Sequence, residues 1–103
     1  MKKIINGSRY DTAKATRIAT ASSEHPSSDF RYWEEAIYRT PRGRWFAAGS
    51  GGPMSRYSRS RGNTTSGGDA IKPLTEEQAR AWLESYDSAG ALAALERYFA
   101  ARI

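Results

Sequence analysis

The chain has 103 residues, of which 39% are hydrophobic and 12% aromatic, and its formal net charge is +5. This length allows one domain with a modest core, and the apolar content excludes global disorder. The sequence has no cysteine, which excludes disulfides and thiolate metal sites and favours a cytoplasmic setting. No apolar run reaches the roughly 20 residues of a membrane span, and the N-terminal MKKIING does not resemble a signal peptide. We therefore expect residues 1–103 to form a single domain with no membrane partner.

A β-hairpin and a helix are predicted at the N-terminus. KKII is typical of a short strand that the turn dipeptide NG stops, and RY continues it as a second arm, so short strands are expected near 3–10. Asp11 and Thr12 resemble a helix N-cap, and the apolar residues that follow recur near helical spacing. The pattern predicts an Ala/Thr-rich helix over residues 12–22.

A longer hairpin is predicted over residues 30–48. The β-prone runs FRYWEEAIYR and RWFAAG flank TPRG, which is typical of a type I turn with glycine in the left-handed position. Alternation along the first strand mixes apolar and charged residues on both faces. One face of the sheet is therefore expected to be half-exposed.

The rest of the chain begins with an irregular segment and ends in two helices. Residues 49–68 are rich in glycine, serine and arginine, which predicts a mostly structureless stretch, and AIK at 70–72 is a candidate strand. LTEEQ has the pattern of a capping box with Thr75 as the N-cap, and it opens an amphipathic helix over about 75–86. A second apolar stripe predicts another helix over about 88–102. The predicted fold class is α+β, a small antiparallel sheet packed against the two C-terminal helices, with the N-terminal helix at an edge.

Positive charge is concentrated in the middle of the chain. Residues 30–62 contain seven arginines and two acids, whereas residues 63–103 contain four basic residues and six acids. The planar guanidinium of arginine suits phosphates and carboxylates, so this segment favours an anionic partner, either a nucleic acid or an acidic protein face. The alternative is a solvated basic surface without a partner.

The sequence offers no recognisable set of catalytic residues. Glu34 and Glu35 are adjacent in a predicted strand and point to opposite faces, so they do not form a cooperating acid/base pair. His25 is the only histidine, and without a second histidine or a cysteine it is not expected to hold a metal. GSGGP has neither the lysine of a Walker loop nor the spacing of a dinucleotide loop, and its proline lacks an amide proton. We therefore expect neither enzymatic activity nor a cofactor.

The segment GSGGPMSRYSRSRG and the preceding hairpin carry the candidate binding residues. Basic groups attract phosphates and aromatic rings stack on bases, although the sequence has no known nucleic-acid-binding signature. Arginine, tyrosine, tryptophan and methionine are also enriched in the centres of protein interfaces, and the same aromatic residues are needed for the core. The predicted partner-binding residues are Arg42, Arg44, Met54, Arg56, Tyr57, Arg59 and Arg61.

Motifs spread from Lys3 to Glu84 resemble those of a family of short proteins encoded by phages and other bacterial mobile elements. They are KKIINGSRYDTAKATRIA, FRYWEEAIYRTPRGRWF, GSGGPMSRYS, SGGDAIKPLT and EEQARAWLE. Several anti-CRISPR inhibitors resemble proteins of this kind. The resemblance implies a cytoplasmic protein of the bacterial host cell that binds a CRISPR-Cas effector without catalysis and blocks target DNA binding or activation.

The hairpin and the glycine-rich segment are more arginine-rich than is usual in this family. This argues against DNA mimicry, which requires dense acidic residues, and favours docking on an acidic surface or in the DNA-binding groove of the effector. The alternative function is a small basic module or regulator that binds DNA or RNA directly. A further alternative is a homodimer built from the C-terminal helices, although a monomer is expected.

Overall fold

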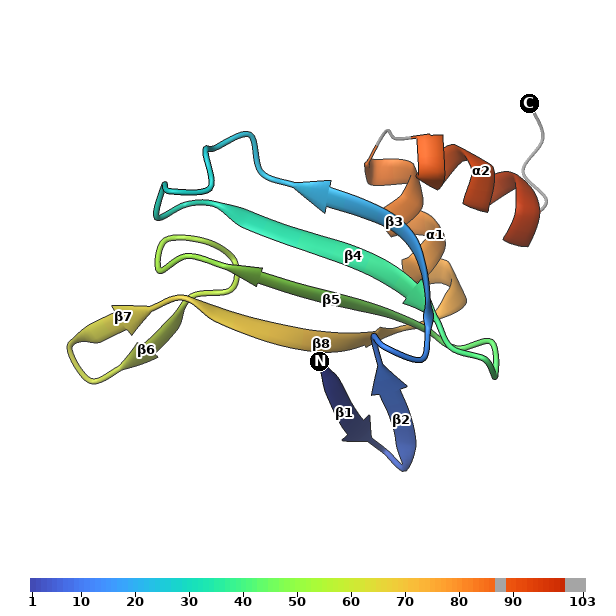
Figure 1. Cartoon of the computed structure of the whole chain (residues 1–103), viewed down its shortest axis with the longest axis horizontal. Helices are drawn as coiled ribbons and strands as arrows, with labels where there is room; N and C mark the ends of the chain where they lie inside the picture. The colour runs from blue at the N-terminus through green and yellow to red at the C-terminus, as the bar shows by residue number, and fades with distance from the viewer. Residues whose placement is uncertain (87–88, 100–103) are drawn as a thin grey trace.

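A four-stranded antiparallel sheet forms the centre of the molecule (Figure 1). The computed structural model describes residues 1–86 and 89–99. In spatial order the strands of the sheet are β3 (Thr16–Ser22), β4 (Trp33–Arg39), β5 (Trp45–Gly51) and β8 (Gly68–Leu74). β4 and β5 are paired on both sides, and β3 and β8 are the edge strands.

Two short hairpins and two helices complete the fold. They are the hairpin of β1 (Lys2–Ile5) and β2 (Ser8–Asp11), the hairpin of β6 (Arg59–Arg61) and β7 (Thr64–Ser66), and the helices α1 (Glu76–Ser85) and α2 (Ala89–Tyr98). The β1–β2 hairpin lies beside the sheet, and the β6–β7 hairpin projects from the end of the sheet at the left of Figure 1. The molecule is elongated, with extents of 47 × 33 × 21 Å.

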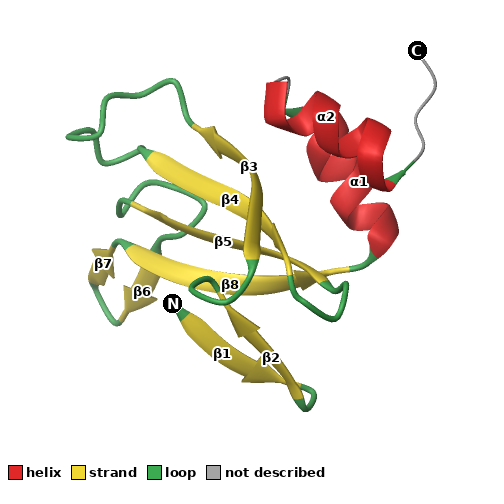
Figure 2. Cartoon of the chain, turned by 45° about the vertical axis from the view of Figure 1, so that its right-hand side comes forward, coloured by secondary structure: helices red, strands yellow, loops and turns green. Residues whose placement is uncertain are grey.

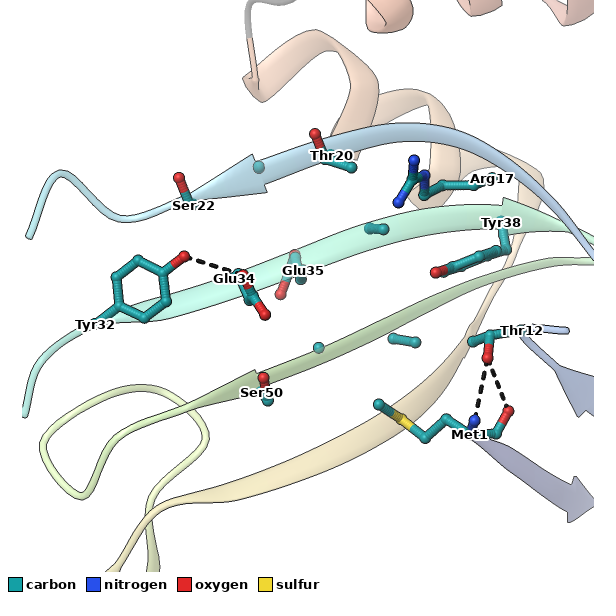
Figure 3. A pocket seen from close by; sticks show the side chains of 14 residues that line it. Met1, Thr12, Arg17, Thr20, Ser22, Tyr32, Glu34, Glu35, Tyr38 and Ser50 are labelled. Atoms are coloured by element: carbon teal, nitrogen blue, oxygen red, sulfur yellow. Dashed lines mark hydrogen bonds between the residues drawn. The ribbon is translucent and has the colours of Figure 1, made fainter. Parts of the chain in front are cut away.

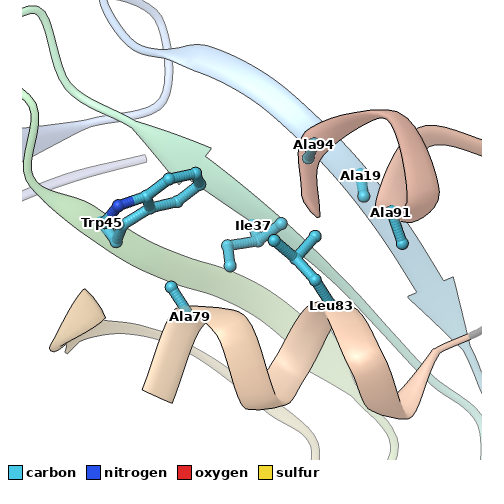
Figure 4. Packing of buried hydrophobic residues seen from close by; sticks show 7 residues of the cluster. All are labelled: Ala19, Ile37, Trp45, Ala79, Leu83, Ala91 and Ala94. Atoms are coloured by element: carbon cyan, nitrogen blue, oxygen red, sulfur yellow. The ribbon is translucent and has the colours of Figure 1, made fainter. Parts of the chain in front are cut away.

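Both helices lie on one face of the sheet, which we call the helix face (Figure 2). Ile37 of β4 projects toward Leu83 of α1, and Trp45 of β5 lies in the same cluster (Figure 4); Ile37 and Leu83 are fully buried. The rings of Tyr98 and Phe99 lie against Trp45, with centroids 5.3 and 5.4 Å away. Alanines fill the rest of this core, and their small side chains let helix and strand approach closely. They are Ala19, Ala79, Ala91 and Ala94.

The β1–β2 hairpin covers one end of the opposite face, which we call the open face. Tyr10 of β2 meets Phe46 edge to face at 5.4 Å, and Tyr38 stacks on Phe46 at 5.1 Å. Ala48 and Ile71 complete this second cluster, in which Phe46 is fully buried. The sheet therefore has a core on each face, and the hairpin anchors the N-terminus to the open face.

The α+β prediction is confirmed for the sheet. The hairpin predicted over 30–48 is β4–β5, and Gly43 in its turn has the expected positive φ of 86°. The strands predicted near 3–10 are β1 and β2, joined by the NG dipeptide with φ of 51° and 78°, as in a type I′ turn. The strand predicted at 70–72 is the centre of the longer β8.

The C-terminal helices are also confirmed. The helix predicted over 75–86 is α1, and Thr75 forms the predicted capping box at its start. The helix predicted over 88–102 is α2. Residues 87–88 and 100–103 lie outside the described part of the chain.

The predicted helix over residues 12–22 is wrong, because most of this segment is strand β3. Its β-branched residues Thr16, Ile18 and Thr20 favour extended backbone. As a strand, the segment forms backbone hydrogen bonds with β4 along one of its edges. This pairing places Ala19 in the core of the helix face. The apolar residues of this short segment fit both helical spacing and the alternation of a strand, and pairing with β4 decides in favour of the strand.

The segment 49–68 is more ordered than predicted. β5 continues through Gly51, and residues 59–66 form the β6–β7 hairpin. Residues 52–58 are a compact loop, in which the Met54 amide donates to the Phe30 carbonyl at 2.8 Å. The segment therefore contributes a loop and a hairpin to one end of the sheet.

The helix-face core predicts a large difference between two leucine truncations. Leu83→Ala should lower the free energy of unfolding by about 2–5 kcal/mol, because it leaves a cavity in the buried cluster. Leu92→Ala removes the same atoms from a side chain that is 55% exposed on α2, so its effect should be about 0.5 kcal/mol or less. Urea denaturation followed by tryptophan fluorescence measures both. Equal losses would contradict this packing.

Candidate functional site

A buried carboxylate organises the part of the helix face nearest the glycine-rich segment. The Glu35 side chain is 7% exposed, and its two oxygens accept hydrogen bonds from the Tyr57 hydroxyl and from Nε1 of Trp82. Arg56 Nη1 lies 3.6 Å from the same carboxylate. We call these four residues the Glu35 cluster. It joins β4, the 52–58 loop and α1 through one charged group.

Aromatic rings surround the cation of this cluster. The Arg56 guanidinium lies 3.8 Å from the ring centroid of Trp33, and it donates to the Tyr86 hydroxyl at 3.1 Å. Burial, and then the hydrogen bond to Glu35 and its negative charge, raise the pKa of Tyr57 above its ordinary value. Tyr57 therefore remains a protonated donor at neutral pH.

Glycines make this arrangement sterically possible. A Cβ at Gly49 would lie 2.2 Å from the Tyr57 hydroxyl oxygen and 2.6 Å from Glu35 Cβ. At Gly52 it would lie 2.4 Å from the Phe30 carbonyl oxygen, and at Gly67 2.5 Å from a β5 carbonyl oxygen. The glycines of this segment therefore allow close packing of the chain on itself, which explains them without a phosphate-binding loop.

The predicted binding residues fall into three groups that do not share one surface. Arg56 and Tyr57 belong to the Glu35 cluster and hold the loop to the sheet. Met54, Arg59 and Arg61 are exposed at the same end of the sheet, on the 52–58 loop and on β6. Arg42 and Arg44 form the third group, in the β4–β5 turn, which lies at the opposite end of the sheet (Figure 1).

Two large apolar side chains are exposed at the end of the sheet that carries the 52–58 loop. We call this end the loop end; it is formed by residues 23–32, residues 52–58 and the β6–β7 hairpin. Phe30 is 65% exposed and Met54 is 67% exposed, and the Met54 amide donates to the Phe30 carbonyl. Sequence reasoning missed Phe30. The signal was a large aromatic residue directly after the polar loop SSEHPSSD, at the edge of the predicted strand.

Basic side chains gather at the opposite end, which we call the turn end. A cavity of about 400 Å³ lies there between the β4–β5 turn and the β1–β2 hairpin with its following turn. Its charged lining residues, which we call the basic pocket, are Arg9, Asp11, Lys14, Arg42 and Arg44. Sequence reasoning missed Arg9 and Lys14, because only tertiary packing brings them to the β4–β5 turn.

A separate hollow, of about 610 Å³, crosses the open face (Figure 3). Tyr32 donates to Glu34 there at 3.0 Å, and the N-terminal amino group donates to Thr12 at 3.2 Å. Arg17 lines the same hollow, so opposite charges face it. Glu34 lies on this face and Glu35 on the helix face, as expected for neighbours in a strand.

The described residues, 1–86 and 89–99, contain no group of three or more His, Asp or Glu side chains placed to hold a metal ion. Within the same residues no helix is long and apolar enough to cross a membrane. No protein-family model matches the chain, and comparisons with curated proteins and with solved structures also found no match.

The Glu35 cluster predicts that two similar tyrosine substitutions differ in effect. Tyr57→Phe should lower the free energy of unfolding by roughly 1–3 kcal/mol, because the buried Glu35 carboxylate loses a donor. Tyr32→Phe also removes a hydroxyl that donates to a glutamate, but Glu34 is exposed to water, so the change should be about 0.5 kcal/mol or less. Urea denaturation of the two variants tests this, and a smaller effect for Tyr57→Phe would refute the structural role of the cluster.

Proposed function

We propose that this chain is a non-catalytic binding protein of the anti-CRISPR type. It docks on a CRISPR-Cas effector through the loop end and blocks target DNA binding or activation. The motif resemblance suggests the class of partner. The choice of surface rests on the exposed pair of Phe30 and Met54.

The Phe30–Met54 pair has the character of an interface anchor. Both side chains are about two-thirds exposed, and a 2.8 Å backbone hydrogen bond holds their two loops together. Large apolar side chains exposed at one end of a molecule often mark protein-binding sites, and aromatic residues and methionine are enriched at interface centres. Burial of both side chains by a partner would supply the apolar centre of an interface.

The loops that carry this pair are held in place before binding. Gly52 donates its amide to the Tyr32 carbonyl at 2.8 Å, and the Ser55 hydroxyl donates to the Gly52 carbonyl at 2.7 Å. The Glu35 cluster fixes the following residues to the sheet and to α1. A surface ordered in advance loses less conformational entropy on binding, which favours affinity.

The charges around the pair favour an acidic partner face. Arg59 and Arg61 are exposed on β6 at this end. Arg59 lies 3.8 Å from an Asp69 carboxylate oxygen, but both side chains are about two-thirds exposed, so water screens this pair strongly. Exposed arginines at the rim of an apolar patch steer association toward negative surfaces.

A pull-down from cells that carry CRISPR effectors tests the proposal. With wild-type protein we expect an effector subunit to be retained after nuclease treatment. The double variant Phe30→Gln, Met54→Gln should weaken binding at least roughly thirtyfold, because even one anchor residue typically contributes about 2 kcal/mol or more. Leu92→Gln is the control, since it also replaces an exposed apolar side chain with glutamine, at a position on α2 that is 55% exposed.

Three outcomes would contradict the proposal. Binding that disappears after nuclease treatment would favour the nucleic-acid-binding alternative. Equal binding by the double variant and the Leu92→Gln control would remove the loop end as the docking surface. Failure to retain any effector subunit would remove the assigned class of partner.

A further inference from the structure

We propose that the basic pocket at the turn end binds the phosphate groups of a nucleic-acid backbone. This inference is independent of the proposed docking at the loop end. It rests on different residues at the opposite end of the sheet.

The pocket holds more positive charge than its own acid neutralises. Four cationic side chains and one carboxylate line it. The acid, Asp11, is paired with Arg9 at 3.3 Å. In the described part of the chain, no ion pair within 4.0 Å involves Lys14, Arg42 or Arg44, and all three are exposed. These three cations are therefore available to an anionic ligand.

The β4–β5 turn presents its arginines on an ordered backbone. The Thr40 amide donates to the Arg44 carbonyl at 2.8 Å, and the Arg44 amide donates to the Thr40 hydroxyl at 3.0 Å. The Gly43 amide donates to the Thr40 carbonyl at 2.8 Å. Thr40 is itself buried, so the turn is fixed from below while Arg42 and Arg44 remain exposed.

Asp11 orders the opposite wall. Its carboxylate accepts from the Ala13 amide at 3.0 Å, and its carbonyl accepts from the Lys14 and Ala15 amides. The Ala13 amide, and then the charges of Arg9 and Lys14, hold the pKa of Asp11 below its ordinary value despite its burial. Asp11 therefore acts as a local cap that positions Lys14. The pocket keeps a net positive charge.

The chemistry of the ligand follows from the type and spread of these cations. Arginine guanidinium groups form paired hydrogen bonds with phosphate oxygens, and lysine adds a mobile point charge. Lys2 lies opposite Asp11 in the register of the hairpin, and alternation along β1 places it on the face of Arg9 and Asp11, where it extends the positive surface beyond the pocket. Cations that continue beyond one pocket favour a chain of phosphates over a single phosphate.

Fluorescence anisotropy with a fluorescein-labelled 12-nucleotide oligo-dT single strand tests the proposal. The wild-type chain should bind it, with an affinity that falls linearly in a plot of log K against log salt concentration. Arg42→Ala, Arg44→Ala should reduce the magnitude of the slope by about 1.4, because each lost phosphate contact on a single strand contributes about 0.7. Taking equal affinities of the two proteins at 1 M salt, a slope difference of 1.4 corresponds to roughly 25-fold weaker binding of the variant at 0.1 M salt.

The matched control is Arg59→Ala, Arg61→Ala. It removes the same two charges from exposed positions on β6, at the other end of the molecule. It should change oligonucleotide affinity by less than about threefold, and far-ultraviolet circular dichroism should show both double variants folded. Equal losses in the two variants would mean that net charge alone attracts the oligonucleotide, and this would overturn the assignment of the pocket.

Pyrophosphate distinguishes the source of the phosphate. Competition by millimolar pyrophosphate, together with oligonucleotide binding, supports a backbone-binding pocket. Pyrophosphate binding that requires Arg42 and Arg44, without oligonucleotide binding, would keep the phosphate pocket and assign it to a small phosphorylated molecule. Binding of neither probe at 0.05 M salt would overturn the proposal. The Phe30→Gln, Met54→Gln variant should bind the oligonucleotide normally, so failure of the docking proposal remains separable.

Discussion

The buried carboxylate of Glu35 is the constraint on which the architecture of the loop end depends. A charge on the covered face of a sheet is strongly destabilising unless donors and a counter-ion reach it. Here the donors come from Tyr57 in the 52–58 loop and from Trp82 in α1, and the cation is Arg56. One carboxylate therefore holds two segments that are distant in sequence against β4, and one of them is the loop that carries Met54.

The glycine-rich segment provides the space that the contacts of Glu35 require. Tyr57 reaches Glu35 across Gly49, where any side chain would occupy the path of the phenol ring. The arginines of this segment are divided between two roles. Arg56 is stacked on Trp33 and paired with the buried Glu35, whereas Arg59 on β6 is paired with the exposed Asp69, and Arg61 is exposed beside it on the same strand. One arginine-rich segment thus supplies both a residue that holds the 52–58 loop to the sheet and residues that are exposed on the surface of the loop end.

The elongated sheet separates two surfaces of different chemistry. The loop end combines two exposed apolar side chains with exposed arginines, and the turn end carries a basic pocket between two ordered turns. β4 and β5 connect them, with an apolar core on each face of the sheet. A partner that contains both protein and nucleic acid offers complementary surfaces to both ends, which is consistent with the two proposals together.

The sequence by itself determined the features that depend on neighbouring residues. The NG turn, the left-handed Gly43, the capping box at Thr75 and the amphipathic α1 follow from local backbone and side-chain preferences, and together they predicted the α+β class. Only the tertiary structure decided that residues 16–22 form a strand, because pairing with β4 outweighs a short and ambiguous apolar pattern. It also decided the sites, since packing of segments far apart in the chain places Arg9 and Lys14 around one pocket with Arg42 and Arg44, and a backbone hydrogen bond joins Met54 to Phe30.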